Sequence, residues 1–362
     1  MLYTVQGFLL IDVDVVALNN AGKDTTTALE NAVATKKIYK NGKSYAYVSG
    51  QAWRYWWRET LKKEFAWKMS PVIREKKIAF TEANPIIYAD DDMFGYMRAA
   101  KEETIDDKGK TKSKNVTLTR VSPLKNSALL SVSPTNIVQN WSSMSRQEGD
   151  AVPYGKDEYC ATMKGMFSVA LEQVGTFSSE ERTGFKNLNG NLKQIAIDNK
   201  ATEIDDPFAK DKTGNPLKLY RLPKETRVKR VEDTIRALEV LNGGAMQTTN
   251  MGDVTPKIIV LTTLGSGNHL FSHLAKDDLG KPVFSLDALK QVVTDYSDRI
   301  VGKVYIGRRM GFMDELEEGF RKLKNELEEE FRKLKEENNR IYYGSVNEAI
   351  RAYTEEVKTQ IP

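Results

Sequence analysis

One segment of the sequence combines residue types that favour binding to a polyanion. Residues 36–77 contain twelve Lys or Arg and three Glu, a net charge of +9, together with four of the five tryptophans. Lysine and arginine release counterions from phosphates, and flat aromatic rings stack on unpaired bases. This composition predicts an RNA-binding surface.

The same aromatic residues also fit the buried face of a helix. From Trp53 to Phe65 a large apolar residue recurs every four positions, which is the spacing of a helical core stripe. Arg54 and Arg58 run down a different side of that helix. Core packing and RNA binding are therefore compatible in this one element.

Metal chemistry has weaker support in the sequence. His269 and His273 have the i, i+4 spacing of some zinc sites, but the segment lacks the glutamate of a metalloprotease motif and an evident third ligand. The acidic triplet at positions 90–92 could bind Mg²⁺, but such triplets are more often solvated turns, and we expect a turn here. We therefore expect no metal site.

Nucleotide and nucleophilic chemistry are also poorly supported. Gly265-Ser266-Gly267 follows an apolar run, yet it matches neither the dinucleotide-binding motif nor the P-loop. Cys160 has no histidine next to it in the sequence and fits a small buried hydrophobe equally well. The sequence thus predicts a protein that is not an enzyme, with no catalytic residues and no cofactor.

Length and composition limit the class of protein further. The chain has 362 residues, a net charge of +4 and 40% apolar residues, enough for a sizeable core in one or two domains. It shows neither the run of about 18 apolar residues that a membrane span needs nor a signal-peptide pattern. A single cysteine excludes an internal disulfide framework. We expect a cytoplasmic protein that does not contact membranes.

Strand and helix patterns alternate along the chain and indicate an α+β fold. Residues 3–17 alternate in polarity like a half-buried strand, Ser49 can cap a helix that reaches about residue 67, and 258–264 form an apolar run typical of a central strand. Short strands are expected at 86–88, 129–132 and 166–174, a helix around Ile235, a helix capped by Ser285 and a strand at 300–306. This order fits one ferredoxin-like, RRM-like palm (β-α-β-β-α-β) with insertions or loops at about 18–47, 76–165 and 178–225.

Residues 313–340 contain an 11-residue near-repeat. Its apolar residues from Leu316 to Leu334 form one stripe, because eleven residues are nearly a whole number of helical turns. Such a charged amphipathic helix either packs the stripe on its own domain or contacts another subunit, and both alternatives stay open here. Ser345 and Glu348 predict a capping box for a final helix over 345–358.

Five short motifs resemble a known protein family. They are 7–12 (GFLLID), 31–37 (NAVATKK), 48–54 (VSGQAWR), 92–97 (DMFGYM) and 120–124 (RVSPL). Together they resemble the DevR-type CRISPR backbone subunits of subtype I-B, which belong to the RAMP superfamily. The resemblance covers about residues 5–130 and is general in pattern beyond them.

The resemblance implies a non-catalytic subunit that is present in several copies in an antiviral Cascade complex. Its copies would form a helical filament on the CRISPR RNA (crRNA), which pairs with target DNA, in contact with other Cascade subunits. Each copy would carry an RRM-like palm and an extended thumb that displaces a base of the guide–target duplex at regular intervals. Residues 100–119 are the first candidate for the thumb, and 140–165 are the second.

A subunit that holds guides of any sequence should contact phosphate and sugar rather than base edges. Ser49-Gly50-Gln51 at a helix start offers N–H groups to a phosphate, a role compatible with Ser49 as a plain helix cap. For Lys36 and Lys37 the alternative is a solvated charge pair, and for Arg98 and Arg120 it is a surface or intramolecular salt bridge. The remaining candidate RNA ligands are Lys36, Lys37, Arg54, Arg58, Arg98, Arg120 and Lys125.

Two other functions fit parts of the sequence. A metal-dependent ribonuclease of the type III kind would use Asp24 or a carboxylate of the 90–92 triplet. A structural adaptor would use the 313–340 helix as a coiled coil, and its basic surface would then serve only solubility.

Overall fold

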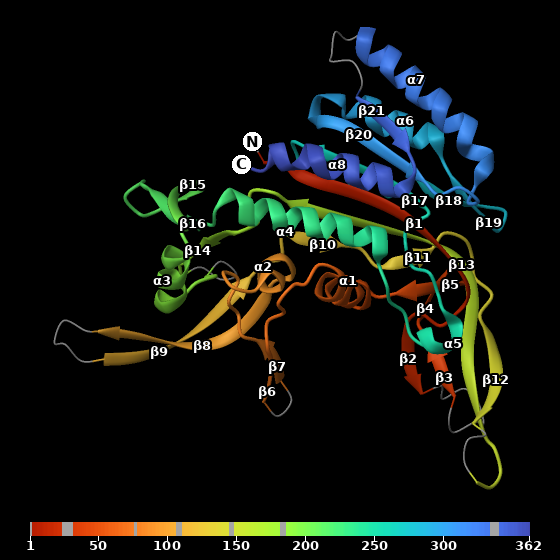
Figure 1. The fold of residues 1–362 in the computed structure, drawn as a ribbon, viewed down its shortest axis with the longest axis horizontal. Helices are drawn as coiled ribbons and strands as arrows, with labels where there is room; N and C mark the ends of the chain where they lie inside the picture. Colours follow the sequence, from red (N-terminus) through yellow and green to blue (C-terminus); the bar gives the residue numbers. More distant parts are fainter. Residues whose placement is uncertain are drawn as a thin grey trace.

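A large mixed β-sheet organises the molecule (Figure 1). The computed structural model describes residues 2–23, 32–75, 78–105, 111–144, 148–181, 186–333 and 340–362. Within these residues the largest sheet has twelve strands, and its main path runs in the order β21-β20-β17-β1-β13-β11-β5-β4. The expected α+β class is confirmed. The path strands are β1 (Thr4–Val16), β4 (Lys37–Lys40), β5 (Lys43–Val48), β11 (Leu129–Ser131), β13 (Val152–Ala170), β17 (Ile258–Leu264), β20 (Ile300–Arg308) and β21 (Ile341–Gly344).

Helices cover both faces of the central strands. On one face α1 (Gly50–Glu64), α4 (Lys224–Arg236) and α8 (Val346–Gln360) contribute to one core, and Val5 and Leu9 of β1 point into it. On the other face α6 (Leu286–Asp295) and α7 (Glu317–Lys333) form a second core around Phe8 and Leu10. Strand β1 is therefore buried on both sides over most of its length, and the expectation of a half-buried strand was wrong. The second layer of helices is the physical reason.

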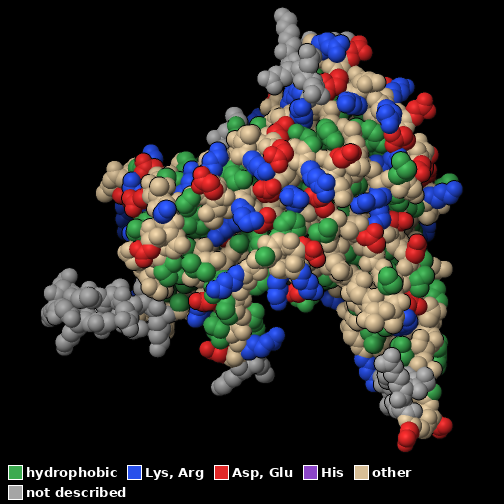
Figure 2. Space-filling model, in the orientation of Figure 1, with side chains coloured by type: hydrophobic (Ala, Val, Ile, Leu, Met, Phe, Trp, Pro, Cys, Tyr) green, Lys and Arg blue, Asp and Glu red, His purple; other side chains and the backbone are tan. Residues whose placement is uncertain are grey.

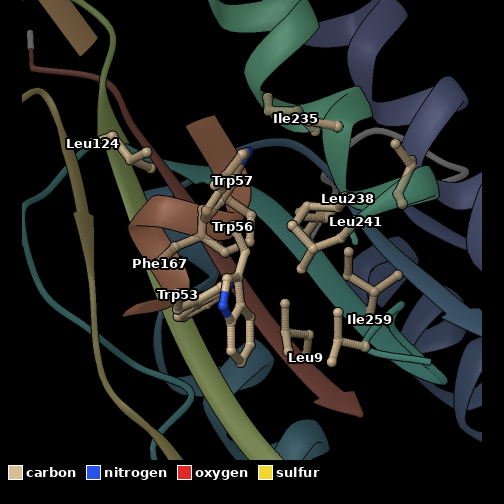
Figure 3. Packing of buried hydrophobic residues seen from close by; sticks show 14 of the residues in the cluster. Leu9, Trp53, Trp56, Trp57, Leu124, Phe167, Ile235, Leu238, Leu241 and Ile259 are labelled. Atoms are coloured by element: carbon tan, nitrogen blue, oxygen red, sulfur yellow. The ribbon is translucent and has the colours of Figure 1, made fainter. Parts of the chain in front are cut away.

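The aromatic stripe of α1 lies in the first core (Figure 3). Trp53 and Trp57 stack with ring centroids 5.5 Å apart, and Phe167 of β13 meets Trp57 edge-on at 5.2 Å. The indole N–H of Trp57 donates to the carbonyl of Thr234 in α4 at 2.8 Å. The prediction that these rings are core residues is confirmed, and the packing fixes α1 against the sheet.

Three hairpins extend from the body of the molecule (Figure 1). The pair β8 (Tyr96–Ile105) and β9 (Thr111–Arg120) lies in the first thumb candidate, whereas β12 (Val138–Met144) pairs with the first half of β13 in the second. The third hairpin joins β6 (Val72–Glu75) to β7 (Ile78–Thr81). Both thumb candidates are therefore antiparallel hairpins. Residues 106–110, between β8 and β9, lie outside the described residues.

Some expected elements differ from the structure. Residues 86–88 form a turn before α2 (Ala89–Phe94) instead of a strand, because the Asn84 side chain accepts the N–H groups of Ile86 and Ile87. The expected strand at 166–174 is the end of the much longer β13. The segment 178–225 is more ordered than loops around short elements. Its described residues contain α3 (Gly190–Asp198) and the strands β15 (Thr202–Lys210) and β16 (Pro216–Arg221). Strand β16 pairs with β15 on one side and with β14 (Thr176–Ser178) on the other.

The charged repeat forms α7, which packs on its own chain. The four apolar side chains of the stripe that lie within α7 are at most 4% exposed and belong to the second core, and Leu316, just before α7, is partly buried against it. Gly319 permits close packing, since a Cβ there would lie 2.4 Å from Leu286 of α6. The structure thus favours intramolecular packing over a coiled coil for this stripe, while Leu334 lies outside the described residues. The stripe residues are Phe320, Leu323, Leu327 and Phe331.

The start of α8 and the turn between β4 and β5 each have a well-defined local geometry. Ser345 and Glu348 form the predicted capping box at the start of α8. A two-residue turn joins β4 to β5, and both Asn41 (φ 53°) and Gly42 (φ 71°) adopt positive φ angles. Such a turn matches the twist of the two strands and sets their register.

Candidate nucleic-acid interface

The start of α1 presents backbone N–H groups at the edge of the first core. The Ser49 hydroxyl accepts the N–H of Ala52 at 3.3 Å, and the first backbone bond of the helix runs from Trp53 N–H to Ser49 O at 3.1 Å. The N–H groups of Gly50 and Gln51 belong to the first turn, where an α-helix supplies no backbone acceptor. The helix dipole adds positive potential, so this turn can accept a phosphate.

The strand β10 (Leu124–Asn126) forms one wall of this helix start. The side-chain amide of Asn126 donates to the carbonyl of Gly50 at 3.2 Å. A Cβ on Gly50 would lie 3.3 Å from that amide nitrogen and 3.4 Å from the carbonyl oxygen of Ser127. Glycine at position 50 therefore allows β10 and the helix start to approach closely.

Arg54 holds this wall in place through both terminal nitrogens of its guanidinium group. One terminal nitrogen donates to Leu124 O and Asn126 Oδ1 at 2.8 and 2.9 Å, and the other donates to Phe94 O and Ser122 Oγ at 2.8 Å each. Burial, and secondarily the nearby Arg58 charge, lowers the pKa of Arg54 to about 10, so it stays protonated at neutral pH. Arg54 thus connects α1 to the end of α2 and to β10.

The rest of α1 contributes exposed or half-exposed basic residues. The Arg58 guanidinium lies over the Phe94 ring, 5.6 Å from its centroid, and Lys62 and Lys63 are exposed. Figure 2 shows Lys and Arg side chains gathered between the projections of β6–β7 and β12–β13, in the region around α1 in Figure 1. This basic surface runs along α1 from Arg58 to Lys62 and Lys63, which lie in the last turn of the helix, about 18 Å from its start.

The two lysines at 36 and 37 point to opposite sides of the sheet. Lys37 is exposed and opposes Ala46, whose side chain belongs to the α1 core. Lys36 precedes it, and its carbonyl accepts the N–H of Tyr47. Side chains alternate along a strand, so only Lys37 shares the face of α1. The exposed Lys125 opposes Ser168, the strand neighbour of Phe167, and therefore also points to the far face.

Arg98 and Arg120 bind protein groups at the base of the β8–β9 hairpin. Arg98 donates to the carbonyl of Glu82 at 2.6 Å and lies over the Phe80 ring. Arg120 is buried and forms an ion pair of 2.5 Å with Asp92. Arg120 thus forms the intramolecular salt bridge of the alternative interpretation, whereas Arg98 binds a backbone carbonyl and a ring instead, and both arginines join the hairpin to the body.

The acidic triplet of α2 is buried, and the expectation of a solvated turn was wrong. Its three carboxylates are at most 5% exposed. Asp92 accepts from Arg120 at one oxygen and from Arg230 at the other, the latter at 2.6 Å, and the N–H of Gly175 also donates to it. The two guanidinium groups supply the counter-charge that makes this burial stable, and they occupy both oxygens of the carboxylate.

A pH dependence of stability follows from Asp90. Burial raises the pKa of Asp90 to about 6 and the neighbouring Asp91 adds to the rise, although the Ser70 N–H bond opposes it. Between about pH 4 and pH 6, Asp90 therefore holds a proton in the folded chain and has lost it in the unfolded chain, where its pKa is the ordinary 3.8. We expect stability to increase as pH falls from 7 through 6 towards 4.

Asp90→Asn should raise the free energy of unfolding at pH 7 by about 1 to 3 kcal/mol and reduce this pH dependence, because Asn keeps the oxygen that accepts from Ser70. Urea unfolding at a series of pH values measures both effects. Asp278→Asn, at an exposed position of β18 (Ala275–Asp278), is the control and should change neither quantity. An Asp90→Asn profile parallel to that of the unmodified chain would contradict the assignment.

Other candidate chemistry gains no support from the described residues. They contain no group of three or more His, Cys, Asp or Glu side chains that could hold a metal ion. Asp24, the other carboxylate of the ribonuclease alternative, lies outside them. Among the helices of the described residues, none is both long and apolar enough to cross a membrane.

Sequence reasoning missed the partners of Arg54. Phe94, Ser122 and Asn126 position the helix start, yet no periodic pattern connects them to α1. A usable signal was present, because two of the five recognised motifs, 92–97 and 120–124, contain Phe94, Ser122 and Leu124. The structure brings both motifs to the same arginine.

The family follows from a comparison with known sequences. Residues 10–279 match the sequence model of a family described as CRISPR-associated negative auto-regulator DevR/Csa2. The chain belongs to the DevR/Csa2 family. The resemblance to DevR-type proteins is thereby confirmed, while subtype I-B stays a prediction. The part of this DevR/Csa2 chain that matches includes the β4–β5 hairpin, α1 and the Arg54 contacts, whereas α6, α7 and α8 follow it.

Comparisons with other known proteins add little to the family assignment. Two solved structures, titled "CRISPR RNA-guided surveillance complex" and "CRISPR RNA-guided surveillance complex, pre-nicking", are 9% and 11% identical to this DevR/Csa2 chain, with TM-scores of 0.42 and 0.41. Each alignment covers 98% of this chain and 99% of the other. Identities and TM-scores this low support no conclusion about function. The comparison with curated proteins gives no match.

Proposed function

We propose that this chain is the repeated, non-catalytic backbone subunit of a type I-B Cascade complex and that it binds crRNA through phosphate and sugar. Membership of a CRISPR-associated family supports the class of protein. The observation that carries the binding role is α1 itself, whose first-turn N–H groups open a helix that carries exposed Lys62 and Lys63 in its last turn. These groups recognise phosphate without reading bases, as a holder of many different guides requires.

The path of the RNA follows from this surface. One phosphate of the RNA binds the Gly50 and Gln51 N–H groups. The adjoining nucleotides pass the exposed side chains of Lys37, Lys62 and Lys63. Arg54 acts as a positioning residue, since its donors already have protein acceptors. Copies of the subunit line up on one crRNA, with the other Cascade subunits, and the guide pairs with target DNA. In this proposal β1, β13, β17 and β20 form the RRM-like palm.

Charge reversal on the α1 face tests the proposal. Lys37→Glu combined with Lys62→Glu should weaken binding of the full chain to two RNAs of unrelated sequence equally, by about tenfold or more. The slope of log K against log salt should fall by about 1.4 for two lost phosphate contacts on a single strand. Fluorescence anisotropy at several salt concentrations measures both quantities.

A matched control changes the same charge elsewhere. Arg321→Glu with Lys322→Glu alters two exposed residues of α7 and should leave RNA affinity nearly unchanged. Equal losses in both variants, or a loss confined to one RNA sequence, would count against the proposed site.

A further inference from the structure

We infer that the sheet face opposite α1 carries a second binding surface, which takes single-stranded nucleic acid. The strand register assigns its members. Leu130 of β11 opposes both Lys164 of β13 and Tyr47 of β5, and cross-strand partners point to the same face. Tyr45, two residues before Tyr47, shares this face by alternation. We call this set the opposite-face surface: Lys36, Lys40, Lys43, Tyr45, Tyr47 and Lys164.

The lysines of the opposite-face surface surround its two tyrosines. Lys40 opposes Lys43 across the hairpin turn, and both are exposed. Among the described residues neither forms an ion pair. The Lys164 ammonium donates to the carbonyls of Ser272 and Ala275 at 3.0 and 3.3 Å, so it adds positive charge at the margin of the surface rather than a free ligand. Burial, with the charge of Lys40, lowers its pKa. Asp12, half-buried and bonded to Thr162, is the acidic neighbour on β1.

The two tyrosines provide a stacking platform. Tyr45 and Tyr47 are half-buried, so each ring is held by its neighbours and still reaches solvent. Alternate residues on a strand are about 7 Å apart, so the two rings can each stack on a different base. Aromatic faces with flanking lysines bind single strands without sequence preference. An acidic protein surface would use the lysines but would leave the stacking faces unexplained, and we therefore favour nucleic acid.

The opposite-face surface is separate from the one proposed for crRNA. The first-turn N–H groups of α1 lie on the other side of the sheet, and adjacent lysines in the sequence, Lys36 and Lys37, are divided between the two sides. One chain can therefore hold a guide on the α1 face and a second single-stranded segment on the opposite face. This inference does not require the proposed function to be correct.

Photo-crosslinking tests the second surface directly. The full chain is first saturated with unlabelled guide RNA, and a 5-iodouracil-substituted DNA single strand is added as the probe. We expect crosslinks at Tyr45 or Tyr47, which mass spectrometry finds in the tryptic peptide between Lys43 and Arg54. Crosslinks confined to peptides outside the opposite-face surface would overturn the inference.

Exposed-residue variants keep the test independent of folding. Lys40→Glu with Lys43→Glu should reduce probe affinity at least fivefold and leave guide binding intact, whereas Lys37→Glu with Lys62→Glu should do the reverse.

Tyr45→Leu with Tyr47→Leu should remove the crosslink, and Tyr→Phe at both positions should preserve stacking affinity. Unchanged probe binding in the Lys40/Lys43 variant would refute the surface. If an acidic protein were the partner, the lysine variant would lose it while the Leu variant would not, which would also overturn the assignment to nucleic acid.

Discussion

Asp92→Asn is expected to lower the free energy of unfolding by about 3 to 5 kcal/mol, because it leaves two buried guanidinium groups without a counter-charge. Asp92 is fully buried, and Arg120 and Arg230 contact it at 2.5 and 2.6 Å. These arginines come from β9 and α4, so the carboxylate joins three distant parts of the chain. Asparagine keeps the shape, removes the charge and replaces one acceptor oxygen by an NH2 group that cannot accept from these donors. Urea unfolding of the full chain at neutral pH measures the loss.

An exposed ion pair gives the matched comparison for Asp92. Lys290 and Glu326 are 2.6 Å apart, but both side chains are well exposed and solvent screens the pair, so Lys290→Ala should cost much less stability than Asp92→Asn. If Asp92→Asn lowered the free energy of unfolding no more than Lys290→Ala, the contact of Asp92 with Arg120 and Arg230 would not be a principal determinant of stability.

Arg54→Ala is expected to lower the free energy of unfolding by about 3 kcal/mol and to weaken RNA binding without changing its salt dependence. Four acceptors lose their donor, and two of them are backbone carbonyls. The wall beside Gly50 then loses its support, which lowers affinity. The salt slope stays constant because Arg54 neutralises no phosphate. Urea unfolding and anisotropy titrations at several salt concentrations give the two readouts.

The conservative variant separates positioning from charge. Arg54→Lys should restore little of either property, since lysine cannot reproduce the planar fork. Arg58→Ala, which removes a half-exposed guanidinium from the face of Phe94, should cost less stability. A clear fall in salt slope for Arg54→Ala would show that Arg54 contacts phosphate directly and would contradict the positioning role.

Local patterns predicted those elements whose signals are local. The capping box at Ser345 and the buried run in β17 were readable because each depends on residues a few positions apart. The first half of β13 was missed because it lies in an exposed hairpin with β12, where polar residues replace the expected apolar run. Burial of Asp92 was missed because its partners are 28 and 138 residues away.

The same distinction applies to the candidate site. Ser49 as a helix cap and the basic character of α1 follow from neighbouring residues. The role of Arg54 does not, because its four acceptors lie 40 to 72 residues further along the chain. The division of Lys36 and Lys37 between two faces required knowledge of the strand pairing.

The Asn41-Gly42 turn has a consequence for how this protein can evolve. A single-residue insertion or deletion between β4 and β5 would shift their pairing by one position and send each side chain of one strand to the other side. Lys36 and Lys37 would then exchange faces, and one change in loop length would alter both of the proposed binding surfaces. We therefore expect relatives to tolerate substitutions on this hairpin far better than changes in its length.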